Sequence, residues 1–397
     1  MKLAARVNRI KPSPTVATAA KAMAMQASGI EVVSLAQGEP DFDTPDNIKE
    51  AAYRAIQKGY TKYTPPGGYD DLKDAIIQKF KRDNQLTYDR SQILVSAGAK
   101  VILYNLAQAL IEAGDEVIVP SPYWVSYTDI VLLADGTPVV VPTTEQEGFK
   151  ITPAKLKAAI TPRTKAFMIN TPCNPTGATY TPEELKALAE VLAGKNILII
   201  ADDIYEKFVY DGKTAMSIAS LGKEVQDQTI IINGVSKTYA MTGWRIGYTA
   251  GPKDLIAALT KIQTQNVTNA TAFCQKASVE ALLGSQEAVL KMVTEFDRRR
   301  RYIVDRLNRM NGITCSMPPG AFYVFPNISG LFGKKWQGKT LSNSIGVTDF
   351  ILEEAKVALV AGIGFGDDRY MRLSYATSMK NIETAMNRLE EALKKLQ

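Results

Sequence analysis

The sequence predicts an α/β protein with a mostly parallel sheet, followed by a smaller α+β domain. From about residue 46, apolar runs of four to six residues alternate with segments of helical periodicity, and the runs end in Gly, Ser, Pro or Asn. Such runs between amphipathic helices are typical of strands that are buried on both faces of a parallel sheet. After about residue 285 this alternation stops, which indicates a second domain of another kind.

The expected elements follow one another along the chain. In the first domain we expect helices near 47–60, 102–114 and 183–195, and strands within 92–98, 115–122, 166–177, 196–205 and 229–237. In the second domain we expect a long charged helix near 295–310, short strands within 312–328, a helix near 347–360, a strand near 370–377 and a terminal amphipathic helix. The carboxyl ends of parallel strands hold the ligand in such sheets, so residues that close each apolar run become functional candidates.

The length of 397 residues is more than one compact core usually holds, so two or three domains are expected. Residues 1–45 have an irregular, proline-containing pattern and are predicted to form an N-terminal arm and the first part of the small domain. Residues 46–285 would form the large domain and residues 286–397 the small C-terminal domain.

The composition excludes several kinds of chemistry. The chain has no histidine, so it has no Ser-His-Asp triad, no histidine-liganded zinc or haem and no imidazole relay, and no metal site is expected. The net charge of +6 is modest, and the one basic cluster, Arg298–Arg301, is interpreted as the polar face of a long helix because apolar residues recur around it at helical spacing. No nucleic-acid partner is therefore predicted.

The cellular setting is expected to be cytoplasmic. Cys173, Cys274 and Cys315 are odd in number and too far apart for a CxxC motif, which is typical of reduced thiols. The basic start of the chain is not followed by a sustained apolar run, and no window approaches the length of a membrane span. These patterns predict no signal peptide and no membrane partner.

Two strand ends carry residues suited to chemistry. Lys237 follows an apolar run, next to Ser236 and eight residues before Arg245. A lysine beside a second cation and apolar residues favours its neutral, nucleophilic form, although a surface lysine with a buried stem fits the same pattern. Asp202 ends a strand of aliphatic residues, with Tyr205 one helical turn further on. A carboxylate there can hold a ring nitrogen in its protonated form, or it can simply cap the next helix.

Two further turns complete the candidate site. Asn174 stands before a proline in a tight turn, a pattern that by itself indicates only a turn. Gly98, Ala99 and Lys100 lie between a strand and a helix, where free backbone amides favour a phosphate. Taken together, an imine-forming lysine, a carboxylate for a ring nitrogen, a phenol and a phosphate cradle are the groups that pyridoxal phosphate (PLP) requires.

With these residues in this order, the chain resembles the class I aminotransferases of the fold-type I PLP-dependent superfamily, and among them the bacterial aspartate and aspartate/prephenate aminotransferases. The resemblance runs nearly end to end, through the segments AQGEPDFDTP, KYTPPGGYDDLK, SPYWVSY, NTPCNPTG, ADDIYE, VSKTYAMTGWRIGY, PGAFYVFP and RLSYATS. It implies a seven-stranded, mostly parallel sheet in the large domain, PLP as cofactor and a homodimer with shared active sites.

The resemblance also implies roles at the cofactor. Lys237 would bind the cofactor covalently and then move a proton, Asp202 would keep the ring nitrogen protonated, and Tyr205 would bond the ring oxygen together with Asn174. Tyr63 would come from the neighbouring subunit. The residues implied to bind the phosphate or stack on the ring are Gly98, Ala99, Lys100, Ser236, Arg245, Tyr63 and Trp124.

For the substrate, the resemblance implies that Arg372 clamps the α-carboxylate of an amino acid or 2-oxo acid. Lys100 matches the lysine that meets the side-chain carboxylate in this subgroup, and Thr18 aligns with a threonine associated with prephenate use. The full set of implied substrate-binding residues is Gly38, Lys100, Trp124, Asn174, Arg372 and Thr18, with Thr268 and Asn269 from the partner subunit.

Two positions depart from the family pattern. Tyr127 stands where many relatives place a histidine that bonds the ring-nitrogen aspartate, and a phenol can donate the same hydrogen bond. Ala97 and Ala99 lack hydroxyls that help to bind phosphate in some relatives, so backbone amides would carry more of that task.

The activity that the resemblance implies is transfer of the amino group of L-aspartate to 2-oxoglutarate by a ping-pong mechanism. Two alternatives stay open at this level. One is an aromatic or prephenate aminotransferase, which differs in whether Lys100 meets a carboxylate. The other is a non-catalytic PLP-binding domain of a regulator, against which the retention of both Lys237 and Arg372 argues.

Overall fold

The computed structural model describes residues 1–397, and a mixed seven-stranded sheet forms its largest layer. The strand order is β2-β8-β7-β6-β5-β3-β4, in which only β8 is antiparallel to its neighbours. The predicted α/β class with a mostly parallel sheet is therefore confirmed. The strands are β2 (Ile93–Ser96), β3 (Glu116–Ser121), β4 (Thr137–Pro142), β5 (Thr164–Asn170), β6 (Leu198–Asp202), β7 (Thr229–Gly234) and β8 (Gly247–Ala250).

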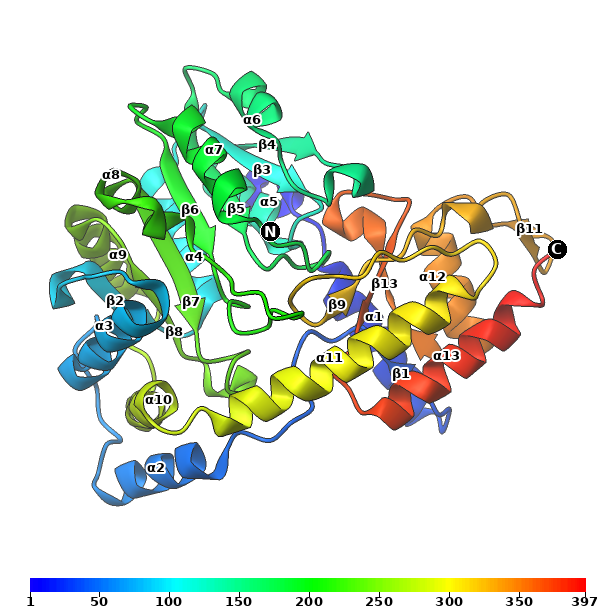
Figure 1. Ribbon diagram of the computed structural model, residues 1–397, viewed down its shortest axis with the longest axis horizontal. Helices are drawn as coiled ribbons and strands as arrows, with labels where there is room; N and C mark the ends of the chain where they lie inside the picture. The colour runs from blue at the N-terminus through cyan, green and yellow to red at the C-terminus, as the bar shows by residue number, and fades with distance from the viewer.

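Helices cover both faces of this sheet (Figure 1). Alternate residues of one strand point to opposite faces, so Ile200 packs in a cluster with α4 and α9, while Ile199 and Ala201 pack in a cluster with α6 and α7. Burial on both faces explains why the strands read as continuous apolar runs. The helices of this region are α2 (Asp46–Gln57), α3 (Asp70–Asn84), α4 (Ala99–Leu110), α5 (Ser126–Leu133), α6 (Pro153–Ala159), α7 (Pro182–Leu192), α8 (Lys223–Asp227), α9 (Lys253–Asn266) and α10 (Ala272–Leu283).

The C-terminal part of the chain forms smaller sheets beside three helices (Figure 1). Strands β13 (Val360–Ala361), β14 (Met371–Ser374) and β9 (Tyr323–Val324) form an antiparallel sheet, and β10 (Lys335–Trp336) pairs with β11 (Lys339–Thr340). The helices are α11 (Glu287–Asn308), α12 (Ser344–Ala355) and α13 (Met379–Leu393). The domain boundaries given above stay a prediction.

The first 45 residues are more regular than their sequence pattern suggested. A helix, α1 (Pro14–Ala27), begins with Pro14 at its first position. Proline is tolerated there because the backbone N–H that it lacks would have no partner within the helix. The expectation of an irregular segment is wrong here because six alanines in this helix favour helical structure. Strand β1 (Val33–Ser34) then pairs in parallel with β12 (Val357–Ala358), so the beginning of the chain lies against its C-terminal part.

Short 3₁₀ helices connect several elements. They are η1 (Ala5–Arg9), η2 (Arg90–Gln92), η3 (Glu145–Glu147), η4 (Ile218–Leu221), η5 (Thr242–Trp244), η6 (Ser329–Leu331) and η7 (Gly362–Phe365). No helix of the structure is both long enough and apolar enough to cross a membrane.

Candidate active site

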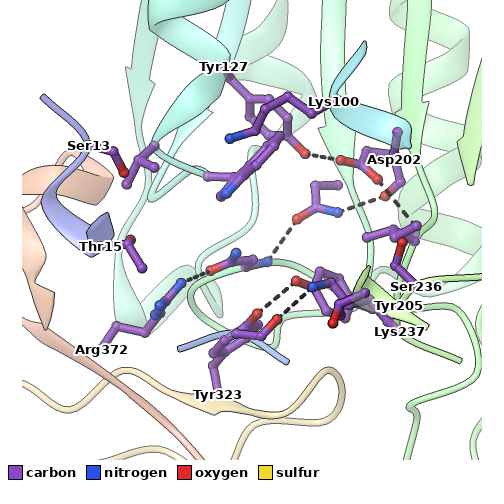
Figure 2. A pocket seen from close by; sticks show the side chains of 18 of the residues that line it. Ser13, Thr15, Lys100, Tyr127, Asp202, Tyr205, Ser236, Lys237, Tyr323 and Arg372 are labelled. Carbon is purple, nitrogen blue, oxygen red and sulfur yellow. Dashed lines mark hydrogen bonds between the residues drawn. The ribbon is translucent and has the colours of Figure 1, made fainter. Parts of the chain in front are cut away.

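A cavity of about 330 Å³ lies at the carboxyl ends of the parallel strands, as ligand sites do in open α/β sheets. Strand β6 ends at Asp202, β7 leads to Ser236 and Lys237, and β14 contributes Arg372 from the opposite wall (Figure 2). Its lining contains most of the residues that the sequence singled out: Gly38, Ala99, Lys100, Trp124, Tyr127, Asn174, Asp202, Tyr205, Ser236, Lys237, Arg245 and Arg372.

Lys237 lies in the turn after β7, and its amino group forms no ion pair. Its Nζ donates a hydrogen bond to the carbonyl oxygen of Gly38 at 2.6 Å, and the exposed part of its side chain faces the cavity. Removal from water lowers the pKa of Lys237 to about 8 against the opposing negative charge of Glu39, and the positive charges of Arg372 and Arg245 add to the lowering. An appreciable fraction of this amine is therefore neutral, and nucleophilic, near neutral pH.

Asp202 is buried at the end of β6 and accepts a hydrogen bond from the hydroxyl of Tyr127 at 2.6 Å. The prediction that the Tyr127 phenol donates to this carboxylate is confirmed. Burial raises the pKa of Asp202 to about 6, and the bond from Tyr127 works against that rise. This carboxylate is thus poised to share or receive the proton of a neighbouring cation.

Helix α4 presents its N-terminus to the cavity beside a guanidinium. No side chain caps the helix, so the amides of Ala99 and Lys100 stay free to bind an anion. Gly98 has a φ of 98°, and a Cβ there would lie 2.4 Å from an amino nitrogen of Arg245, so only glycine allows the arginine to approach. Arg245 in turn donates to the carbonyl oxygen of Thr242 at 2.9 Å.

Arg372 is buried, only 2% exposed, without a carboxylate partner. Its guanidinium donates to Asn174 Oδ1 at 3.0 Å and to the carbonyl oxygen of Ala36 at 2.5 Å, while its Nε has no partner. Burial lowers the pKa of Arg372 from its ordinary value. A buried guanidinium that bonds only neutral acceptors is a strong site for a carboxylate.

Tyr323 lines the same cavity, although sequence reasoning did not single it out. Its hydroxyl lies 2.8 Å from the hydroxyl of Tyr205, and its ring packs under the guanidinium of Arg372 at 4.6 Å (Figure 2). The segment PGAFYVFP contains this residue, but Tyr205 is 118 positions away, and no local pattern reveals a contact over that distance.

Lys100 stands at the cavity with its amino group 4.8 Å from the centre of the Trp124 ring. It is exposed and forms no ion pair in the structure. Partial removal from water lowers the pKa of Lys100, and the charge of Arg245 adds to the effect. The cavity therefore contains a cation on the Trp124 side in addition to Arg372 on the opposite wall.

Five of the predicted site residues are not in the lining of this cavity, and one of them, Gly98, immediately precedes α4. Thr18 lies outside it, and Thr15, which precedes Thr18 by three positions on α1, lines it together with Ser13. Tyr63, Thr268 and Asn269, which the sequence assigned to a partner's site, lie together in a separate hollow of their own chain. Tyr63 is 88% exposed there.

The family of the chain follows from comparison with known proteins. Residues 30–389 match the family model described as aminotransferase class I and II. The chain is 50% identical over 392 residues to an aspartate aminotransferase of Geobacillus stearothermophilus, with 98% of each chain covered. It is 47% identical over 392 residues, again with 98% of each chain covered, to a probable aspartate/prephenate aminotransferase of Rickettsia bellii.

The structure agrees with this assignment. The crystal structure of an aspartate aminotransferase from Rhizobium meliloti superposes with a TM-score of 0.97 at 42% identity, covering 100% of both chains. This chain therefore belongs to the class I and II aminotransferase family, and it is an aminotransferase.

Proposed function

We propose that the chain transfers the amino group of L-aspartate to 2-oxoglutarate with PLP as cofactor. The observation that carries this proposal is Lys237, a lysine largely removed from water at the cavity, with a pKa of about 8 and no carboxylate partner. A structural lysine at such a position would be paired, because an unpaired buried charge is costly. Lys237 instead faces an anion-binding helix end, a buried carboxylate and a buried guanidinium.

The residues present fit this cofactor. Asp202 would pair with the ring nitrogen, and Tyr205 with Asn174 would face the ring oxygen. The free amides of α4 would hold the phosphate with Ser236 and Arg245, since Gly98 brings the guanidinium to the helix end. Trp124 would cover one face of the ring. When bound, the cofactor supplies an electron sink for the carbanion formed at the substrate Cα.

The chain's own residues would attach the cofactor and move or hold the protons. Lys237 would first hold the cofactor covalently and then, once released, act as the base that takes the Cα proton, for which a pKa of about 8 is well matched. Asp202 would hold the ring-nitrogen proton, and its bond from Tyr127 would keep the carboxylate oriented for that contact.

Two cations would select the substrate. Arg372 would bind the carboxylate that every amino acid and 2-oxo acid carries, because its unpartnered Nε is a free buried donor. Lys100, free of ion pairs and seated on Trp124, would meet the second carboxylate of aspartate or 2-oxoglutarate. The names of the relatives, aspartate and aspartate/prephenate aminotransferases, support a dicarboxylic substrate.

A homodimer is part of the proposal. Tyr63, Thr268 and Asn269 lie together in a hollow outside the Lys237 cavity, and Tyr63 projects from the surface. In a dimer with shared sites these residues would complete the cavity of the other subunit. A sedimentation measurement should then give a dimer mass, and Tyr63→Phe should weaken cofactor binding.

The test of the proposed function is the visible absorption of the purified protein. A cofactor band that bleaches with L-aspartate and returns with 2-oxoglutarate would support it. A band that stays with aspartate but bleaches with an aromatic amino acid would overturn the choice of substrate and leave the cofactor assignment intact.

The second-carboxylate assignment has a sharper test. Lys100→Met keeps the apolar stem on Trp124 and removes only the charge. We expect kcat/KM for aspartate to fall about 10- to 100-fold, with a change of less than about 3-fold for a monocarboxylic amino acid. An equal loss for both substrates would mean that Lys100 serves the phosphate instead.

Prephenate is a second candidate substrate. Thr18, which the resemblance associates with prephenate, lies outside the cavity, but Thr15 and Ser13 line it and offer hydroxyls to a polar ring substituent. If prephenate is accepted, it should restore the visible band after aspartate has bleached it. Thr15→Val should then weaken prephenate more than 2-oxoglutarate, and equal effects would argue against this role.

A further inference from the structure

Two buried tyrosines, Tyr205 and Tyr323, share a hydrogen bond, and its direction decides which hydroxyl proton can reach a ligand. The hydroxyls of Tyr205 and Tyr323 lie 2.8 Å apart, and neither has another hydrogen-bond partner in the structure. The two side chains are 4% and 1% exposed. Burial raises the pKa of both phenols, so each hydroxyl keeps its proton at physiological pH and only one of them can donate to the other.

Arg372 decides which hydroxyl donates. Its guanidinium lies 4.6 Å from the centre of the Tyr323 ring and cannot accept a hydrogen bond. A positive charge near a phenol makes its hydroxyl more acidic. The Arg372 charge lowers the pKa of both phenols against the larger effect of burial, but it lies over the Tyr323 ring, whereas the pKa of Tyr205 stays well above its ordinary value. Tyr323 is therefore the better donor, and the proton of Tyr205 stays available for a ligand oxygen.

The backbone holds Tyr323 in this place. Tyr323 belongs to β9, which pairs with β14, so its position is fixed relative to Arg372 on that neighbouring strand. On the other side, a Cβ at Gly38 would lie 2.2 Å from the Tyr323 hydroxyl. The carbonyl oxygen of the same glycine accepts the bond from Lys237. Tyr323 therefore lies next to Arg372 and Tyr205, and next to the glycine whose carbonyl oxygen accepts the bond from Lys237.

We propose that Tyr323 is a positioning residue that couples carboxylate binding at Arg372 to the hydrogen-bond strength of Tyr205. With Arg372 unpaired, Tyr323 donates strongly and Tyr205 becomes a better donor to the cofactor oxygen, because hydrogen bonds in a chain strengthen one another. A carboxylate on Arg372 neutralises the charge over the ring and weakens both bonds. This inference rests on the proposed function, since it takes Tyr205 to face the cofactor oxygen.

A purely structural role is the alternative. Tyr323 also packs against Phe322, with ring centres 4.9 Å apart, in a cluster of aromatic side chains that includes Tyr205. If packing were its only task, phenylalanine would replace it without changing any titration in the cavity. The hydroxyl is thus the group to test.

Tyr323→Phe removes that hydroxyl and keeps the ring. The readout is the pH midpoint of the visible band of the cofactor-loaded protein, with and without succinate, a dicarboxylate that cannot react. In the variant we expect the midpoint without succinate to rise by about 0.5 unit, because Tyr205 stabilises the anionic ring oxygen less well. The upward shift that succinate causes in the wild type should be smaller in the variant.

Tyr370→Phe is the matched control, since Tyr370 is a buried tyrosine just before β14 that stacks on Phe325 and does not line the cavity. It should leave both midpoints unchanged. An unchanged midpoint and an unchanged succinate shift in a folded Tyr323→Phe would overturn the coupling alone. A wild-type protein without any visible band would overturn the proposed function as well.

Gly38→Ala provides a second route should Tyr323→Phe fold poorly. The added Cβ collides with the Tyr323 hydroxyl and must displace it. The midpoint should rise in Gly38→Ala to about the same extent. A midpoint equal to that of the wild type in a folded Gly38→Ala would contradict the coupling.

Discussion

Lys79 and Lys237 are two lysines withdrawn from bulk water, and they differ in what surrounds the amino group. Lys79, on α3, is 2% exposed and forms an ion pair with Glu206, while its Nζ also donates to Asn84 at 2.8 Å. Lys237 has no ion pair and bonds one carbonyl oxygen. Burial with a partner stabilises the charged form, whereas burial without one favours the neutral amine.

The same short segment of chain supplies both environments. Asp202, at the end of β6, faces the cavity of Lys237, and Glu206, four positions on, faces Lys79. Asn84 and Asn233 donate further hydrogen bonds to Glu206, so the carboxylate oxygens of Glu206 have their partners within this cluster. In this protein, a buried cation without a carboxylate partner therefore marks the reactive site, and a buried cation with one marks a structural cluster.

The largest expected effect is on turnover, which should depend on Lys237 and not on Lys79. Lys237→Met should reduce turnover by at least about 10⁴-fold, because it removes both the covalent attachment and the base. Lys79→Met should change kcat by less than about 3-fold in protein that remains folded. Steady-state rates with aspartate and 2-oxoglutarate measure both. Appreciable turnover by Lys237→Met would contradict the mechanism.

Their effects on stability should have opposite signs. Lys79→Met leaves Glu206 buried without its cation and should lower the free energy of unfolding by about 3–5 kcal/mol. Lys237→Met removes an unpaired charge and should raise it by about 1–3 kcal/mol at pH 7, allowing for water in the cavity. Urea unfolding of the cofactor-free proteins is the measurement. A loss of stability in Lys237→Met would show that the Gly38 bond outweighs desolvation.

The pH dependence of that difference sharpens the comparison. The pKa of Lys237 is about 8 when folded and near the ordinary 10.5 when unfolded. Below pH 8 both states are protonated and the cost of the charge is complete. Between pH 8 and 10.5 only the unfolded state holds the proton, so the wild type gains stability as pH rises. The wild type should therefore approach Lys237→Met above pH 8, and parallel curves would contradict the lowered pKa.

The smallest expected effect concerns Tyr127. Tyr127→Phe removes the bond to Asp202, whose pKa should then rise by about one unit above its present value near 6. The pH below which cofactor affinity declines should move up by a similar amount. Tyr239→Phe is the control, since the Tyr239 hydroxyl donates to the neutral amide of Gln286, outside the cavity. An equal shift in both variants would contradict the specific role of Tyr127.

The sequence alone was enough to predict the class of fold and five of the seven strands of the large sheet, but not β4 or β8. Apolar runs between amphipathic helices have few stable arrangements other than a doubly covered parallel sheet. Because the carboxyl ends of parallel strands meet at one edge, Lys237 and Asp202 could be brought together by reasoning alone. The missing histidine also restricted proton-transfer chemistry to lysine, tyrosine, cysteine, carboxylates or a cofactor.

The protonation states of the site residues and the contacts across the cavity depend on the tertiary structure. The neutral tendency of Lys237 could be predicted from Arg245 and the apolar run before it, but the effect of Arg372 on Lys237 and the raised pKa of Asp202 depend on burial and on distant segments. The contact of Tyr205 with Tyr323, and the choice of Thr15 instead of Thr18 at the cavity wall, depend on how the small sheets and α1 pack against the large sheet. A one-dimensional pattern specifies which faces are buried, but the three-dimensional packing decides which side chains meet there.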